Sequence, residues 1–431
     1  MEVSCTFRIL RTQGSIKWMW GGGVSPLPLL QVFSIPWAPP FTFGPPFNSV
    51  LADSPLNTLL DFTEDENHRF ADFTVSPTHP HLLIAILEDH THPSPSEVET
   101  SLVLINTSTK TVSLVVSGAD FYASPRFSPD GNYLVWQQWW HPDMPWQGAE
   151  IYVAKVTVSS DGEKVELGEK TLVGGVRGQV SAAYPLWITN ETALFTSDVS
   201  GYQNPWSHST LTGKSAPILP TPVEKDFSLP GWSLGRSYSA VLDEKGEKVL
   251  CSVIQDGRAV LFVLDAKSGT ITEVKSPYVE ISSVRSIPKT GEVFFIGGQS
   301  SEPSEIISLT ISPTTPSFKI LKSTPSSVTS SFPPGIVSVA QPITIKVPPN
   351  DDPVHLNFYP PTNPEYSGGV DGEKPPCVFG VHGGPTSMSN QVLSWNKQYF
   401  TSRGWAWCVF FLLDLCAIAV AEFERLQLCF S

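Results

Sequence analysis

The sequence has 431 residues, 41% hydrophobic and 16% charged, and this composition excludes a disordered or fibrous protein. A formal net charge of −14 argues against a nucleic-acid partner, because phosphates require a basic surface. The 40 prolines and 31 glycines favour many short strands joined by turns over a helical bundle. The six cysteines contain no CxxC pair, so we expect free thiols in a reducing compartment and a cytoplasmic location.

The N-terminal segment differs from the rest of the chain. Residues 1–67 are rich in proline and show no periodic pattern, so we predict an irregular segment there. Its basic residues are scattered among glycine and proline, and no compact apolar stretch follows them as it does in a signal peptide.

From about residue 68 the chain repeats a turn followed by strands. The turn is clearest at residues 127–131, Phe-Ser-Pro-Asp-Gly, and an apolar strand follows it. The repeat is anchored at Val75, Phe127, Trp187, Trp232 and Val284, with spacings of 52, 60, 45 and 52 residues. Further strands follow in each unit, for example at residues 149–154 and 259–265, and Asp-Gly pairs supply hairpin turns.

A period of this length, with several strands in each unit, is typical of propeller blades. One blade cannot cover both of its own faces, so neighbouring blades must stack around an axis. We therefore predict a mainly β protein, with an incomplete β-propeller of about five blades over residues 68–325.

The pattern changes in residues 326–407, for which we predict a linker and the start of an α/β-hydrolase domain. Residues 343–347 and 354–359 predict a hairpin, and residues 377–381 predict a buried strand that ends in His382-Gly383-Gly384-Pro385. In α/β-hydrolases a loop of this kind gives a backbone N–H to the oxyanion hole. Its glycines let the backbone approach a substrate carbonyl. The alternative is a tight turn with an incidental histidine.

Several segments together carry a family resemblance: residues 124–131, 141–146, 374–386, 396–400 and 403–406. Over residues 68–407 the chain resembles the prolyl oligopeptidase family of serine peptidases (family S9), in its acylaminoacyl-peptidase or dipeptidyl-peptidase branch. The resemblance implies that Gly383 and Gly384 are oxyanion-loop positions, supported by His382 and Pro385. It also implies no cofactor, and short peptide substrates that a propeller filters.

Beyond Trp407 the sequence departs from the family pattern, in which a Gly-x-Ser-x-Gly nucleophile, an Asp and a His would follow. We therefore expect a truncated hydrolase domain, an aberrant hydrophobic tail over residues 408–431, no catalytic triad and no peptidase activity. The alternative function is a non-catalytic propeller that binds peptide or protein. Residues 405–421 are apolar apart from Asp414, so a membrane anchor is the alternative for this stretch, although we expect none.

One Gly-x-Ser-x-Gly sequence occurs, at residues 231–235, and Asp265 and His382 follow it in the order of a hydrolase triad. We reject Ser233 as a nucleophile, because the residues after it predict a β-hairpin and not the required helix. Trp232 and Ser233 also match the anchor of the blade repeat.

Two other groups of side chains are candidates for a site. The pairs His79/His81 and His90/His92 lie in proline-rich turns without a third ligand, so we predict no metal site. A cluster of tryptophans could line a substrate entrance or pack a propeller face, and the sequence leaves both interpretations open: Trp136, Trp139, Trp140 and Trp146.

Overall fold

The computed structural model of the chain divides into two units, Met1–Pro36 and Trp37–Ser431. It describes residues 9–12, 15–18, 67–287, 290–311, 315–323, 333–347, 351–366, 368–370, 372–381 and 388–411. In the first unit, β1 (Ile9–Thr12) and β2 (Ser15–Trp18) form an antiparallel hairpin. The segment predicted to be irregular therefore contains regular structure. Two residues separate the strands, the second of them glycine, as in tight hairpins.

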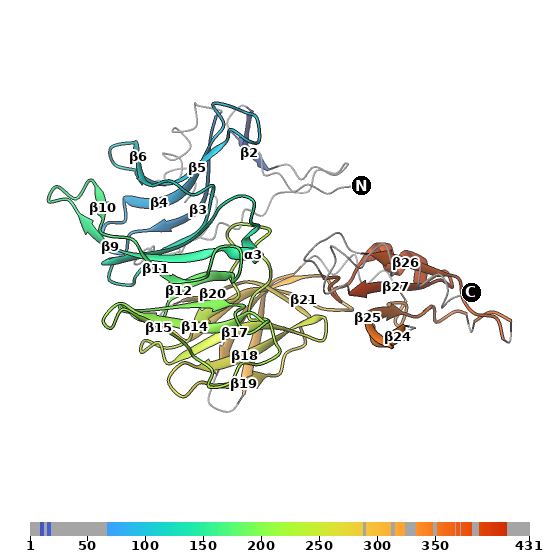
Figure 1. The fold of residues 1–431 in the computed structure, drawn as a ribbon. Coiled ribbons are helices and arrows are strands. Elements are labelled where there is room, and N and C mark those ends of the chain that lie inside the picture. Colours follow the sequence, from blue (N-terminus) through green and yellow to red (C-terminus); the bar gives the residue numbers. More distant parts are fainter. Residues whose placement is uncertain are drawn as a thin grey trace. The chain divides into compact units, whose positions relative to one another are not determined.

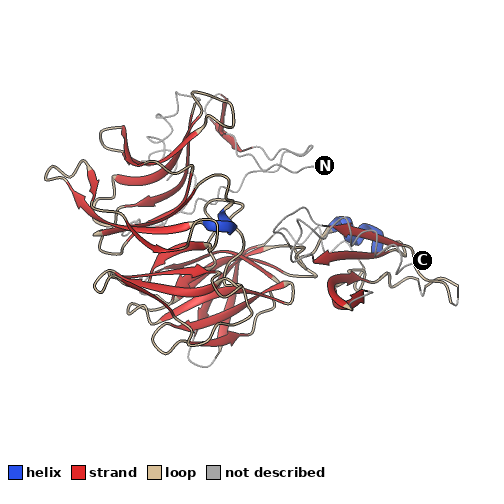
Figure 2. Ribbon diagram, in the orientation of Figure 1, coloured by secondary structure: helices blue, strands red, loops and turns tan. Residues whose placement is uncertain are grey.

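Strands dominate the second unit (Figure 2). Five antiparallel sheets follow one another along the chain, from β3 to β23 (Figure 1). In four of them the strands pair in chain order, and the second sheet has a fifth strand because β10 and β11 both pair with β9. The strands of the first three sheets are β3 (His68–Val75), β4 (Leu82–Asp89), β5 (Glu99–Asn106), β6 (Thr111–Val116), β7 (Phe121–Phe127), β8 (Tyr133–Trp139), β9 (Glu150–Val158), β10 (Val165–Leu167), β11 (Thr171–Gly174), β12 (Ala182–Trp187), β13 (Thr192–Ser197), β14 (Asn204–Ser209) and β15 (Lys214–Pro217). Those of the last two are β16 (Ser239–Val241), β17 (Lys248–Gln255), β18 (Arg258–Asp265), β19 (Thr270–Val274), β20 (Glu280–Ile287), β21 (Glu292–Gly298), β22 (Glu305–Ile311) and β23 (Pro316–Lys322).

The repeated turn joins the first and second strands of a sheet. In the second sheet the Ser128 Oγ accepts from the Tyr133 N–H (2.9 Å) and donates to Asp130 Oδ1 (2.6 Å). In the fourth sheet the Asp243 carboxylate accepts from the N–H groups of Lys245 (2.9 Å) and Lys248 (2.7 Å). Short polar side chains thus satisfy backbone donors that the turn would otherwise leave without partners.

The apolar faces of successive sheets pack against each other. Ile84 of the first sheet shares a core with Trp136 of the second, and Leu250 of the fourth shares one with Phe295 of the fifth. Two further cores lie between the second and third sheets and between the third and fourth. Each intermediate sheet is therefore covered on both faces, which is the arrangement of a propeller-like domain. The number of blades in the whole domain stays a prediction.

The last sheet has a different topology, with the strand order β24-β25-β27-β26. It contains β24 (Gln341–Val347), β25 (Asp352–Tyr359), β26 (Cys377–Val381) and β27 (Ala406–Phe411). β26 runs parallel to β27, and the helix α4 (Trp395–Thr401) lies between them in the sequence, so the three elements form a β-α-β unit. β24 and β25 form the predicted hairpin. The predicted domain boundary at residue 407 cuts β27, which continues to Phe411.

The prediction of a buried strand at residues 377–381 is wrong in one respect. β26 exists, but it lies at the edge of the described sheet, and the Phe379 side chain is 45% exposed. A short apolar run indicates a strand without indicating how many neighbours it has.

The described part of the chain contains no helix that is long and apolar enough to cross a bilayer. The described residues of the apolar stretch 405–421 belong mainly to β27, and residues 412–421 lie outside the described residues.

Candidate functional site

The predicted oxyanion loop follows directly after β26. Four residues of this loop lie outside the described residues: His382, Gly383, Gly384 and Pro385. β26 itself ends at Val381, paired in parallel with Phe410 of β27. In open α/β sheets, ligands bind beyond the carboxyl ends of parallel strands. The sequence position of the loop therefore matches the usual place of a site in such a sheet.

An open depression of about 360 Å³ lies near this end of β26. Gly380 and Trp407 of the mixed sheet line it, together with Asn390 and Lys397. The Lys397 Nζ donates to the Tyr359 hydroxyl (3.0 Å) and lies over its ring. Burial lowers the pKa of Lys397 to about 8. The Trp407 Nε1 is buried and has no hydrogen-bond partner in the described part of the chain. The depression thus offers hydrogen-bond donors and one serine, Ser389, and no histidine is among the described residues that line it.

The segment after the predicted loop contacts the propeller-like domain. The Asn390 Nδ2 donates to Glu280 Oε1 (3.1 Å), and the Leu393 N–H donates to the Gln299 carbonyl (2.9 Å). Glu280 begins β20, and Gln299 directly follows β21. The mixed sheet is therefore joined by hydrogen bonds to the fifth sheet.

The apparent nucleophile at Ser233 lies in an exposed loop that leads into β16, and no helix follows it. The rejection of Ser233 therefore stands, but one reason given for it is wrong. In sheets one to three, the anchor residue ends the first strand, as Phe127 ends β7. In the fourth sheet Val241 ends the first strand and Asp243 makes the turn. Trp232 lies before that strand and is not an anchor.

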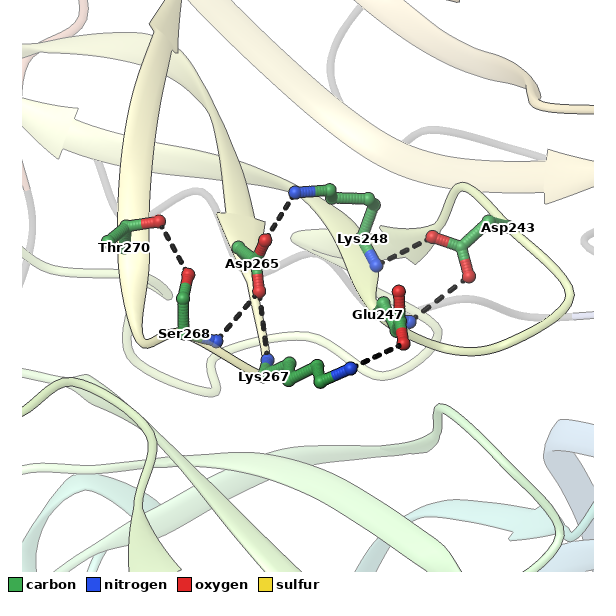
Figure 3. A network of polar contacts seen from close by, with 7 residues as sticks. All are labelled: Asp243, Glu247, Lys248, Asp265, Lys267, Ser268 and Thr270. Carbon is green, nitrogen blue, oxygen red and sulfur yellow. Dashed lines mark hydrogen bonds and ion pairs between the residues drawn. The ribbon is translucent and has the colours of Figure 1, made fainter.

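Asp265, the carboxylate that follows Ser233 in the sequence, belongs to a turn network on the fourth sheet (Figure 3). Its carboxylate pairs with the Lys248 ammonium and accepts from the N–H groups of Lys267 (3.0 Å) and Ser268 (2.8 Å). The hydrogen bond from Lys248, with those from Ser268 and Lys267, lowers the pKa of Asp265. Asp265 therefore holds a hairpin together and orients no histidine.

The histidine pairs make separate local contacts. The His81 Nε2 lies 3.0 Å from the Gly162 carbonyl, the His79 Nδ1 lies 2.9 Å from the Thr78 hydroxyl, and the His90 Nε2 lies 3.1 Å from Glu88 Oε2. Among the described residues, no three His, Cys, Asp or Glu side chains are grouped to hold a metal ion.

The four tryptophans do not form one surface. Trp136 is fully buried and stacks on Tyr152, and Trp139 stacks on Phe121, so both pack the second sheet. Trp146 belongs to the short helix α3 (Pro145–Gly148). Its ring lies 4.4 Å, centroid to centroid, from that of Trp232, which is 51% exposed. The packing interpretation holds for the first two residues, whereas the Trp146–Trp232 pair lies at the surface.

The sequence analysis missed a group of arginines on the first strands of the sheets. Arg126 of β7 and Arg285 of β20 each follow a positive-φ residue by two positions, at Ser124 and Ser283. The Arg126 guanidinium pairs with the Asp72 carboxylate at 2.9 Å. The signal was an arginine inside each of two strands. The sequence alone did not indicate that the second and fifth sheets bring these arginines close enough for their charges to interact.

The comparisons with known proteins come from solved structures, since no family model and no curated protein matches the chain. A Mycobacterium tuberculosis puromycin-hydrolyzing peptidase is 28% identical, with a TM-score of 0.69, over 80% of this chain and 51% of that chain. A puromycin hydrolase is 25% identical with the same TM-score, over 80% of this chain and 50% of that one. Prolyl oligopeptidase B from Galerina marginata, 11% identical with a TM-score of 0.57, covers 80% of this chain and 45% of its own and shows the fold alone.

This chain spans about half the length of these neighbours. A puromycin-hydrolyzing peptidase and a prolyl oligopeptidase are thus among the structures that this chain resembles, which supports the resemblance drawn from the sequence.

Proposed function

We propose that this chain carries the substrate-selecting propeller and the first part of the hydrolase domain of a serine peptidase of the prolyl oligopeptidase type. The observation that carries the proposal is the succession of five antiparallel sheets and a β-α-β unit, in a chain 28% identical to a puromycin-hydrolyzing peptidase. Short peptides are the proposed ligands. The acylaminoacyl-peptidase or dipeptidyl-peptidase branch is the proposed subgroup.

The proposal assigns the backbone N–H groups of Gly383 and Gly384 to the oxyanion hole, with His382 and Pro385 shaping the loop. Such a donor stabilises the charge that grows on the carbonyl oxygen, by about 3–4 kcal/mol in the barrier. The nucleophile, base and orienting carboxylate are not among the candidates in this sequence, because Ser233 lies in a loop and Asp265 in a hairpin network. The chain by itself is therefore proposed to be inactive.

A chimera tests this function. Residues 68–407 of this chain would be joined to the hydrolase residues that follow the matched region in the Mycobacterium tuberculosis neighbour. We expect the folded chimera to hydrolyse short peptides and to react with a fluorophosphonate probe. A folded, monodisperse chimera that neither reacts with the probe nor hydrolyses peptide would contradict the assignment. The neighbour's own hydrolase portion, expressed without a propeller, is the control.

A further inference from the structure

The first strands of four sheets share one backbone distortion. A non-glycine residue with positive φ occurs in each: Asp72 in β3 (48°), Ser124 in β7 (50°), Tyr184 in β12 (54°) and Ser283 in β20 (57°). At each of these positions the pairing with the second strand shifts register. A bulge re-aims the side chains around it, and this conformation is unfavourable for residues other than glycine. Its recurrence marks a place where side-chain direction matters.

These first strands contact one another. The Ser124 N–H donates to Asp72 Oδ2 (2.8 Å), which links β7 to β3. The Trp187 Nε1 of β12 donates to the Arg126 carbonyl of β7 (2.9 Å). The Ser237 Oγ, just before β16, donates to the Val284 carbonyl of β20 (2.7 Å). Hydrogen bonds therefore join the first strands of sheets one to three, and the segment before β16 to β20.

A small, partly open cavity lies beside the bulges of β7 and β12. Its walls include Ser124, Arg126, Tyr184, Arg236 and Tyr238, and its volume is about 40 Å³. A water molecule occupies about 30 Å³ in the liquid, so the cavity has room for a group of the size of a carboxylate.

The charge around the cavity is unbalanced. Arg126 pairs with Asp72, whose side chain is 3% exposed. The Arg285 guanidinium donates to the carbonyls of Val284 (3.0 Å) and Gly235 (2.9 Å), and these neutral groups do not cancel its charge. Arg236 forms no ion pair within the described residues. Among the described residues, the three guanidinium groups therefore have one paired carboxylate, Asp72, while the charge of Glu280 reaches Tyr238 and its carboxylate accepts from Asn390.

The lowered pKa of Arg285 is consistent with this excess of positive charge. Its pKa is lowered to about 10, by burial first and then by the charge of Arg126, while Asp72 opposes the shift. A second anion beside these arginines would relieve the repulsion that Asp72 leaves uncompensated.

The cavity wall also contains an uncharged hydrogen-bond donor, the Tyr184 hydroxyl. The Tyr184 hydroxyl is buried and has no hydrogen-bond partner in the described part of the chain. Its ring meets that of Tyr238 edge to face, with centroids 4.9 Å apart. Burial first, and then the neighbouring Tyr238 hydroxyl, raise the pKa of Tyr184 well above its ordinary value, so the Tyr184 hydroxyl keeps its proton and remains a donor. A buried donor of this kind costs free energy until an acceptor arrives.

We propose that Arg126, Arg236, Arg285 and Tyr184 form an anion site that binds the carboxylate of a short peptide. The site pairs planar guanidinium groups with a planar carboxylate, the geometry that arginine recognises best. That the carboxylate belongs to a peptide rests on the proposed function. The carboxylate can be the C-terminus or an acidic side chain, since both present the same chemistry.

The test is calorimetric titration of the full chain with three N-acetylated tripeptides. One has a free C-terminus, the second is its C-terminal amide, and the third is an amide that carries an aspartate. We expect the amide without a carboxylate to bind about tenfold more weakly than the better of the two carboxylates, because a charged hydrogen bond is lost. Which carboxylate peptide binds better identifies the source of the anion. Equal affinity for all three peptides would overturn the proposal.

Two single-residue variants test whether the peptide carboxylate binds at the proposed anion site. Arg236→Gln removes an exposed guanidinium and should leave the fold intact, as thermal unfolding would verify. It should weaken binding of the carboxylate peptide about tenfold, while binding of the amide stays unchanged. Arg258→Gln removes the same charge from the exposed start of β18 and is the matched control, with unchanged binding expected. An Arg236→Gln chain that binds as tightly as the parent, or a control that loses as much, would contradict the site.

The peptide-binding test and the chimera test can fail independently of each other. Carboxylate binding that persists beside an inactive chimera would keep the site and remove the peptidase assignment. An active chimera whose parent chain does not distinguish carboxylate from amide would remove this site alone.

Discussion

The five antiparallel sheets and the mixed sheet bury their apolar side chains in different ways. In the first region each intermediate sheet is covered by its neighbours, so residues such as Trp136 and Phe295 are almost fully buried. In the second region the described core is small, built around Val354, Leu356 and Cys408. Phe379 on its edge strand is 45% exposed. A repeated module buries its apolar faces against copies of itself, whereas a parallel strand depends on elements that come from elsewhere in the chain.

The largest expected effect contrasts one phenylalanine from each region. Phe295→Ala should destabilise the chain by about 3–5 kcal/mol, because it opens a cavity between the fourth and fifth sheets. Phe379→Ala should cost about 1 kcal/mol or less, since much of that ring already contacts solvent. Urea unfolding followed by tryptophan fluorescence measures both. Equal losses in the free energy of unfolding would contradict the difference in burial between the two regions.

The ion pair between the first and second sheets should give the next largest effect. Asp72→Asn keeps a residue type that tolerates positive φ and removes only the charge, which leaves the Arg126 side chain, 17% exposed, without a carboxylate partner. We expect a loss of about 3 kcal/mol in the free energy of unfolding. Asp351→Asn, which changes an exposed carboxylate at another residue with positive φ, is the control and should be nearly neutral. A neutral Asp72→Asn variant would show that the pair adds nothing to the packing of the sheets.

Lys397 gives the mixed sheet a distinct pH dependence. Its pKa in the folded chain is lowered to about 8, so between pH 8 and its ordinary pKa near 10.5 the unfolded chain binds more protons. The contribution of Lys397 to stability should therefore rise as the pH rises through this window. Lys397→Met should stabilise the chain at pH 7 by about 1–3 kcal/mol and remove this rise.

The difference between the two chains, measured by urea unfolding from pH 7 to 9.5, isolates Lys397 from other titrating groups. Lys374→Met, at an exposed position, is the control. A parent-minus-variant difference that stays flat across this range would contradict the lowered pKa.

The smallest effect is expected from the turn network in Figure 3. Asp265 has a lowered pKa because Lys248 and two backbone N–H groups stabilise its charged form. Its contribution is therefore present at neutral pH and is lost as the pH falls below the ordinary pKa of a carboxyl group. Asp265→Asn should shift the urea midpoint only slightly at pH 7, because solvent screens the ion pair. A shift as large as that of Asp72→Asn would contradict this ranking.

Much of the propeller-like domain could be predicted from local patterns. Alternating apolar residues and Asp-Gly turns predicted strands at residues 149–154 and 259–265, where β9 and β18 lie. The fourth anchor was misplaced because Trp232 and Ser233 resemble the Phe-Ser pair at 127–128 in residue type. The true turn relies on the Asp243 carboxylate, which accepts the same kind of backbone donor without an aromatic residue before it.

The candidate sites were less predictable. The positions of Gly383 and Gly384 as oxyanion-loop residues stay a prediction, since they lie outside the described residues. The arginine cluster could not be predicted, because Arg126 comes from β7, Arg285 from β20 and Arg236 from the loop before β16, and no local pattern indicates the bulges beside Arg126 and Arg285.

The most direct test of the account is fluorophosphonate labelling of this chain beside the chimera described above, with labelled serines located by mass spectrometry. The account predicts no labelled serine in this chain and one in the chimera, within the residues supplied by the neighbour. Labelling of Ser233, or of any other serine in the chain alone, would contradict it.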